Sequence, residues 1–441
     1  MEPLPCAQSP STGPHSVRLS AFGDKFAASS GISSLMDDLG TALEENPSLL
    51  FMGGGNPGRV EAAEAFFRQR IEAVLADPAR RHQLFGVYQS PQGDRTLREE
   101  LAAYLSREYG WPISSRHIAI ANGSQSAFFV LYNLFAGRMA DNTQRHIHLP
   151  LSPEYVGYAD IGLGEDFFTA TRPRIEYLDG ARFRYHIDFP SLAIDERVAA
   201  LCVSRPANPT GNVISDEEVG ALAARAAQAK VPLILDGAYG LPFPALIYRD
   251  ARPYWDDNTV LMLSLSKLGL PGARTGIVIA HPDIAEAFAR ANTVISLACG
   301  TLGPQLLRGT LADGSLDHLC RDGLRPFYAE RRRLALEVFD RERGDLPLRV
   351  HAPDGAFFLW LWCENLPIDS RELYERLKAR GLVVLPGNDF FIGTGHDWSH
   401  RRECLRLSYA GDSATIRAGI DILISELRDV YAGTARSTLR V

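Results

Sequence analysis

The feature that most constrains the fold is a series of short, nearly continuous apolar runs that alternate with longer helical patterns. The runs are rich in valine, isoleucine and leucine and occupy residues 117–122, 147–151, 199–204, 232–236, 260–266 and 276–280. Runs of this kind are typical of strands buried on both faces, as in parallel sheets with crossover helices. Their alternation with helical stretches predicts a doubly wound α/β domain.

Two of the intervening stretches carry recognisable helix signals. Residues 124–137 are strongly apolar and predict a buried helix. Residues 216–230 predict a second helix, with Ser215 as N-cap and Glu218 three residues later, which is the pattern of a capping box.

The pattern changes near residue 326, where a long charged helix begins. Alternating residues at 355–362, a helical pattern at 370–381 and short strands at 382–386 and 405–410 follow. This predicts a smaller α+β domain. We therefore divide the chain into a flexible tail (1–18), a segment packing with the small domain (19–52), a large ligand-binding domain (53–325) and a small C-terminal domain (326–441).

Composition narrows the partners and the compartment. The 441 residues carry a net charge of −7, so a nucleic-acid backbone is not an expected partner. No apolar run reaches the roughly 18 residues of a membrane span. The six cysteines are scattered without a CxxC pair, and the N-terminus lacks a secretory pattern. We expect a cytoplasmic protein without disulfides.

The absence of common catalytic patterns is also informative. No HExxH or CxxC pair is present, so no metal site is expected, and GxSxG is absent, which disfavours a serine hydrolase. The glycines of residues 53–58 match a dinucleotide-binding fingerprint. However, a loop-like stretch follows where that fold requires a second strand with an acidic end.

The segment SLSKLGLPGARTG at 264–276 carries the strongest chemical signal. Lys267 follows an apolar strand, lies between Ser264, Ser266 and Arg274, and could simply be a surface lysine. Alternatively, a lysine that forms a Schiff base needs a partly desolvated amine near a cation. Hydroxyl groups and a guanidinium are also ligands that bind phosphate well.

Two further strand ends carry polar residues. Asp236 ends a strand, with Tyr239 three residues on, and could be a turn residue or a carboxylate that pairs with a pyridinium nitrogen. Asn208 lies in the loop 204–212, which could be an ordinary turn. Ligands of α/β proteins bind at the carboxyl ends of strands, where Asn208 could donate to a phenolate.

The turn at 121–127 joins a strand to a helix. The free N–H groups at the helix start and the Ser124 hydroxyl form a plausible anion site, although many βα turns look similar.

Taken in order, these segments resemble the fold-type I pyridoxal-phosphate aminotransferases, the aspartate aminotransferase superfamily. The shared motifs are NGS, PEY, NPTG, DxAY, SxSK and a late RLSY, and the resemblance extends from about Leu19 to the C-terminus. Longer strings, including FGDKF, GGGNP, NGSQSAFF and FFLWLW, are similar to the valine–pyruvate aminotransferase branch.

The resemblance implies a fold, a cofactor and partners. The fold would be a large domain with a mostly parallel sheet flanked by helices, plus a smaller α+β domain. The cofactor would be pyridoxal 5′-phosphate, and the partners would be amino acids and 2-oxo acids. The active unit would be a homodimer with active sites at the interface.

It also implies residue roles. Lys267 would form the internal aldimine and shuttle the proton, Asp236 would pair with the ring nitrogen, and Tyr155 would stack on the ring. Asn208 and Tyr239 would bond the phenolate. The phosphate would be held by Gly123, Ser124, Gln125, Ser264, Ser266, Arg274 and, from the other subunit, Tyr88. Arg406 would clamp the substrate α-carboxylate, with Asn208 and the backbone near Gly55 completing the substrate site.

The expected reaction is L-valine plus pyruvate giving 3-methyl-2-oxobutanoate plus L-alanine, with ping-pong kinetics. One methylene in an apolar pocket is worth about 1–3 kcal/mol, so other small neutral amino acids are an alternative. A C–S lyase, a sensor domain and a binding protein without turnover are further alternatives. Ile32 and Leu35, or Phe357 and Phe390, are candidates for the side-chain pocket or for ordinary core.

Overall fold

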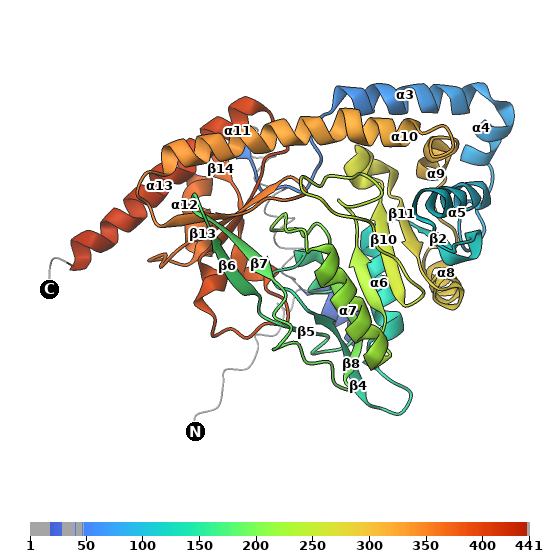
Figure 1. The fold of residues 1–441 in the computed structure, drawn as a ribbon, viewed down its shortest axis with the longest axis horizontal. Coiled ribbons are helices and arrows are strands. Elements are labelled where there is room, and N and C mark those ends of the chain that lie inside the picture. The colour runs from blue at the N-terminus through green and yellow to red at the C-terminus, as the bar shows by residue number, and fades with distance from the viewer. Residues whose placement is uncertain (1–17, 29–39, 41–45, 47, 439–441) are drawn as a thin grey trace.

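The computed structural model describes residues 18–28, 40, 46 and 48–438. Figure 1 shows two bodies joined by a long helical run, from α10 (Ser315–His318) through a π-helical turn at Leu319–Leu324 to α11 (Arg325–Arg343). Ile32 and Leu35 lie outside the described residues.

The larger body is built on a mostly parallel sheet, as predicted. Its spatial order is β2 (Ile118–Ala121), β11 (Gly276–Ile279), β10 (Thr259–Ser264), β9 (Leu233–Asp236), β8 (Val198–Ser204), β4 (Gln144–Leu149) and β3 (Gly137–Arg138), with β5 (Phe168–Ala170) paired to β4. Strands β10, β9, β8, β4 and β5 are parallel.

One predicted strand runs in the opposite direction. Strand β11 is antiparallel to both β10 and β2. Only residues 265–275 join β10 to β11, which is fewer than the roughly dozen residues that a parallel crossover needs. The chain therefore reverses through short 3-10 turns at Ser266–Leu268 and Pro271–Ala273.

The strands of this sheet are apolar throughout because both faces are covered. In β9, Ile234 packs in a core shared with α6 (Ser124–Phe135) and α8 (Pro282–Ser296). Its neighbours Leu233 and Leu235 belong to the core that contains α7 (Asp216–Ala229). Alternate residues thus enter opposite cores, which confirms the expectation from the apolar runs.

The capping box predicted for α7 is present. The Glu218 N–H donates to Ser215 Oγ at 3.1 Å, and the Ser215 N–H donates to Glu218 Oε2 at 2.8 Å. The other helices of the larger body are α3 (Glu61–Ala76), α4 (Pro78–Phe85), α5 (Arg95–Tyr109) and α9 (Leu302–Leu307).

The smaller body contains a second sheet that draws on both parts of the chain. Its order is β15 (Leu385–Pro386), β16 (Cys404–Ser408), β13 (Phe358–Cys363), β12 (Leu348–His351), β7 (Arg182–His186) and β6 (Arg174–Leu178). The hairpin β6–β7 comes from the middle of the chain and pairs with β12 in parallel. This contact links the two bodies, and the domain limits given above remain a prediction.

Two helices and a short N-terminal strand complete the smaller body. The helices are α12 (Ser370–Ala379) and α13 (Ser413–Thr438). Strand β1 (Leu50–Phe51) pairs in parallel with β14 (Leu382–Val383). The preceding helix α1 (Ala21–Ala27) instead contacts the larger body, where Lys25 Nζ donates to the Gly164 carbonyl at 2.8 Å.

None of the helices within the described ranges is long and apolar enough to cross a membrane.

Candidate active site

The carboxyl ends of neighbouring strands meet at one edge of the larger sheet. Ser204 of β8 lies opposite Asp236 of β9, and Asp236 lies opposite Met262 of β10. Ala121 at the end of β2 lies opposite Gly276, where the antiparallel β11 begins. Because these ends coincide, segments far apart in the sequence share one site.

A cavity of about 460 Å³ opens at this edge. Most of the predicted site residues line it: Gly55, Ser124, Gln125, Tyr155, Asn208, Asp236, Tyr239, Ser264, Ser266, Lys267, Arg274 and Arg406. Side chains that the sequence did not single out complete the wall, among them Phe51, Phe128, Ser204 and Leu385.

Two predicted residues do not line the cavity. Gly123, with φ +94°, borders it: a Cβ there would lie 2.4 Å from the Arg274 guanidinium, so only glycine lets Arg274 lie against this loop. Tyr88 is 81% exposed and lies on the surface. Within the single chain it therefore takes no part in the site.

Lys267 lies partly buried in the cavity. Its amine donates to the Gly55 carbonyl at 2.6 Å and lies 5.1 Å from the centre of the Tyr239 ring. Desolvation, with the positive charge of Arg406 as the next cause, lowers the pKa of this amine to about 8. The lowered pKa increases the neutral fraction of the amine near neutral pH, which is what a nucleophilic lysine requires.

Asp236 is a buried carboxylate with two donors. The Tyr158 hydroxyl donates to its Oδ2 at 2.5 Å, and the Ala238 N–H donates to its Oδ1 at 2.9 Å. Burial raises the pKa of Asp236, whereas these hydrogen bonds and the charge of Lys267 lower it. The carboxylate is thus fixed in orientation at the inner end of the cavity.

Arg406 is buried and held by neutral groups. Its guanidinium donates to Asn208 Oδ1 at 2.8 Å and to the Gly53 carbonyl at 2.5 Å, and its Nε has no partner. The rings of Phe358 and Phe390 lie 4.4 and 5.3 Å from it. Desolvation lowers the pKa of this guanidinium to about 10.

The candidate side-chain pocket residues Phe357 and Phe390 are core residues. Both are fully buried, and neither lines the cavity. Phe357 packs on Tyr239 and Tyr328, whereas Phe390 packs on Arg406. They support the site from behind.

The cavity carries an excess of positive charge. Its charged lining residues are Lys267, Arg274 and Arg406 against the single carboxylate Asp236. Among the described residues, no carboxylate forms an ion pair with Arg274 or with Arg406. Arg274 is exposed, whereas Arg406 is buried, and buried charges are normally paired, so the position of Arg406 favours an anionic ligand.

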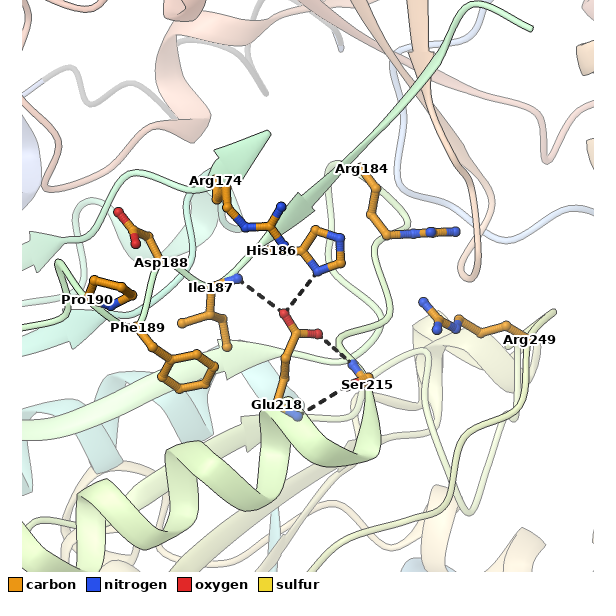
Figure 2. Close-up of a pocket in the computed structure, with 10 residues that line it drawn as sticks. All are labelled: Arg174, Arg184, His186, Ile187, Asp188, Phe189, Pro190, Ser215, Glu218 and Arg249. Atoms are coloured by element: carbon orange, nitrogen blue, oxygen red, sulfur yellow. Dashed lines mark hydrogen bonds and ion pairs between the residues drawn. The ribbon is translucent and has the colours of Figure 1, made fainter. Parts of the chain in front are cut away.

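A second cavity has similar size but different electrostatics. It measures about 430 Å³ and is lined by Arg174, Arg184, Arg249, His186, Glu218 and their neighbours, none of them a predicted site residue. Figure 2 shows Glu218 at the start of α7 bonded to the His186 ring and to the main chain of Ile187 and Ser215. Arg184 and Arg249 pair with Asp354 at 3.0 and 3.4 Å.

Within the described ranges, no group of three His, Cys, Asp or Glu side chains is placed to hold a metal ion. His146 and His148 form a local HxH pattern in β4. The two ring nitrogens of His148 lie within hydrogen-bonding distance of the Thr169 and Thr171 hydroxyls, at 2.8 and 2.9 Å. These contacts tie β4 to the segment that contains β5.

With the geometry in place, the comparisons with known proteins define the class. The sequence profile of the class I and II aminotransferases matches residues 60–423. The chain therefore belongs to this family, whose members depend on pyridoxal phosphate, and it has the predicted fold-type I architecture.

Several relatives cover almost the whole chain. The valine–pyruvate aminotransferase of Escherichia coli K12 is 45% identical over 416 residues, 94% of this chain and 99% of the relative. A crystal structure assigned as an amino-acid aminotransferase from Psychrobacter arcticum 273-4 gives a TM-score of 0.92 at 40% identity, covering 95% and 100% of the two chains. The crystal structure of valine–pyruvate aminotransferase from Salmonella typhimurium LT2 gives a TM-score of 0.84 at 42% identity, covering 91% of this chain and 100% of that chain.

The described residues fit pyridoxal phosphate. The helix start at Ser124, the Ser264 hydroxyl and the unpaired Arg274 provide donors for a phosphate dianion. The buried Asp236 provides an acceptor for a ring N–H, and the Asn208 amide group, whose oxygen is taken by Arg406, retains donors for a phenolate oxygen.

Proposed function

We propose that this enzyme transfers the amino group between L-valine and pyruvate, giving 3-methyl-2-oxobutanoate and L-alanine. The observation that carries this proposal is the cavity that combines a lysine of lowered pKa with two arginines lacking carboxylate partners. The relatives named as valine–pyruvate aminotransferases, similar over nearly their full length, support the choice of substrates.

The charge count supports a neutral side chain on the substrate. Arg274 is assigned to the cofactor phosphate and Arg406 to the substrate α-carboxylate. Among the described lining residues, no third arginine remains for a distal carboxylate, such as that of glutamate. Apolar neighbours, including Phe51, Phe128 and Leu385, suit a small aliphatic group instead.

The residues of the cavity have defined tasks in the proposed reaction. When bound, pyridoxal phosphate supplies an electrophilic aldehyde and a ring that withdraws electrons from the substrate Cα. Lys267 holds the cofactor and carries the proton removed from Cα, a contribution of about 10²–10⁴-fold for a placed base. Asp236 holds the proton on the ring nitrogen, and Tyr155 covers the ring face.

The remaining contacts orient the two ligands. Asn208 and Tyr239 bind the phenolate oxygen, and the loop of Gly123, Ser124 and Gln125 binds phosphate together with Ser264, Ser266 and Arg274. Arg406 receives the α-carboxylate, with Asn208 holding the guanidinium in place at 2.8 Å. The backbone near Gly55, whose carbonyl accepts from Lys267 at 2.6 Å, closes over the α-carboxylate.

We further propose that the active unit is a homodimer in which Tyr88 reaches the partner's phosphate. Exposed apolar side chains gather near the phosphate loop: Phe85, Val87, Tyr88, Val294, Ile295, Leu297 and Leu302. The Thr301 hydroxyl donates to the Leu84 carbonyl, and the Gly300 N–H donates to Asn122 Oδ1, beside Gly123. Exposed apolar groups in such a cluster favour a protein interface.

We propose a cytoplasmic location for this dimer. Cys202, Cys299, Cys320, Cys363 and Cys404 are free and buried, which suits a reducing compartment.

A half-reaction experiment tests the function. L-valine or L-alanine added to the purified holoenzyme should convert the visible absorbance of the bound cofactor to that of its amino form, and pyruvate should restore it. Glutamate should act far more slowly. Faster turnover of glutamate than of valine and alanine would reject the substrate assignment, and ammonia release from cystathionine in place of transfer would favour a lyase.

A further inference from the structure

A line of buried polar groups extends from Asp236 away from the cavity. Tyr158 donates to Asp236, and its oxygen lies 3.4 Å from Ser204 Oγ. Ser204 Oγ in turn lies 2.5 Å from Glu154 Oε2, and the Ser204 N–H donates to Glu154 Oε1 at 2.8 Å. The roles assigned above do not use Glu154 or Tyr158.

Glu154 is completely buried and has no cation beside it. Its exposure is 0%, and no ion pair among the described residues includes it. The other titratable groups along this line, Asp236, Tyr132, Tyr158 and Cys202, are acids, and the cation Lys267 acts only on the Asp236 end. Burial, with the charge of Asp236 as a further contribution, raises the pKa of Glu154 to about 8.

Two buried carboxyl groups joined by two hydroxyls do not both ionise easily. Asp236 is the better place for the negative charge, because it accepts from Tyr158 and from the Ala238 N–H and faces Lys267. Glu154 accepts from the main-chain N–H groups of Ser204 and Tyr155, but no lysine or arginine acts on it as Lys267 acts on Asp236. Lys267 therefore makes Asp236 the favoured site for the negative charge and Glu154 the favoured site for the proton.

We propose that Glu154 is a neutral carboxylic acid that donates to Ser204 and, through Ser204 and Tyr158, positions Asp236 for the cofactor ring. With this proton in place, each hydroxyl points its hydrogen toward Asp236, and successive donors in one direction strengthen one another. An ionised Glu154 would turn the Ser204 hydroxyl away and leave Tyr158 without a donor. This positioning role rests on the proposed function, since it concerns the same cofactor.

Infrared spectra of the protein stripped of cofactor test the protonation directly. The difference spectrum between the parent and Glu154→Gln should show loss of the carbonyl stretch of a protonated carboxylic acid near neutral pH. Loss of carboxylate bands alone would overturn the proposal. This measurement needs neither cofactor nor substrate, so a failed transamination with the expected infrared result would reject the reaction and retain the neutral Glu154.

Cofactor affinity tests the positioning. Glu154→Ala and Ser204→Ala should each raise the Kd for pyridoxal phosphate about tenfold, and the double variant should be no weaker than either, because both break one line. Glu154→Gln keeps a donor to Ser204 and an acceptor for its N–H, so it should restore the Kd to within about twofold. If Glu154→Ala fails to fold, the Kd of Ser204→Ala, which removes one hydroxyl, still shows whether this line of groups positions Asp236 for the cofactor.

The chain offers a matched pair of controls. Tyr132 and Tyr158 pack against each other at 5.4 Å, and both are fully buried, but the Tyr132 hydroxyl bonds to Cys202. Tyr158→Phe should weaken cofactor binding and lower kcat with little change in KM, whereas Tyr132→Phe should change neither. Equal effects of the two variants, additive effects of Glu154→Ala and Ser204→Ala, or a Gln variant as defective as Ala would each overturn the proposal.

Discussion

The two cavities described here have nearly the same volume and nearly the same number of arginines, yet they differ in how their charges are paired. In the cavity beside α7, Glu218 accepts from His186 and from main-chain N–H groups (Figure 2). Asp354 pairs with Arg184 and Arg249, and the third arginine, Arg174, is exposed and has no ion pair among the described residues. In the cavity at the strand ends, Arg406 and Arg274 have no carboxylate partner among the described residues.

The difference teaches that a buried charge without a partner, and not volume or the number of charged residues, marks a ligand site. Paired groups gain nothing from an incoming anion, because binding would first break their existing contacts. A buried guanidinium without a carboxylate partner, such as that of Arg406, gains the full interaction when an anion arrives. The predictions below test this contrast, beginning with the largest expected effect.

Replacing Lys267 with alanine should abolish activity. The variant loses both the amine that holds the cofactor and the base at Cα, so kcat should fall by more than about 10⁴-fold. Circular dichroism and the Tm should stay close to the parent values. A Lys267→Ala enzyme that retained more than a few per cent of the transamination rate would show that another group does this chemistry.

Replacing Arg406 with alanine should raise KM for every amino acid on the order of 10- to 100-fold, the effect of losing charge-assisted hydrogen bonds to a common carboxylate. Arg406→Lys keeps the charge but loses the planar guanidinium, so its KM should lie between those of the parent and of Arg406→Ala. Steady-state kinetics with valine and alanine decide the point. An increase confined to one of the two substrates would place Arg406 in the side-chain pocket instead.

The pKa of Lys267 gives a prediction about pH. A lysine must be neutral to attack an aldehyde, so the rate at which the apoprotein binds pyridoxal phosphate should rise with pH and level off above about 8. Arg406→Ala removes a positive neighbour that lowers this pKa, so its midpoint should move to higher pH. Stopped-flow absorbance measures the binding rate against pH for the parent and for Arg406→Ala. Equal midpoints in the two proteins would contradict the effect of Arg406 on the pKa of Lys267.

Glu218→Gln in the cavity beside α7 should leave kcat and cofactor affinity unchanged. It should cost about 1 kcal/mol of stability through the weakened helix cap. The hydrogen bond that His186 donates to Glu218 raises the pKa of His186, so this contact stabilises the parent at low pH and is lost as pH rises through that pKa. Denaturant titrations at several pH values should show this slope in the parent and a shallower one in the variant. A large fall in kcat would mean that the second cavity also serves the reaction.

Much of the site was predictable because it depends on strand order. Asp236, Asn208 and Lys267 each follow an apolar run, and parallel strands bring their carboxyl ends to one edge. The capping box of Ser215 and Glu218 was predictable for a similar reason, since its partners are three residues apart.

Contacts between distant segments were not predictable in this way. The hairpin β6–β7 joins the second sheet, and Phe358 and Phe390 enclose Arg406, through registers that no local pattern encodes. Glu154 was visible only as part of a PEY motif. Its burial and its contact with Ser204, 50 residues away, appear only when the chain is folded. The direction of β11 depended on the short connection after β10.

The most direct test of the central claim is to map the lysine that binds the cofactor. The chain has only four lysines, Lys25, Lys230, Lys267 and Lys378, so borohydride reduction of the holoenzyme followed by peptide mass spectrometry gives an unambiguous answer. We predict one phosphopyridoxyl group per chain, on Lys267. A stoichiometric adduct on another lysine, or none at all in an active preparation, would contradict the assignment of the cavity at the strand ends as the active site.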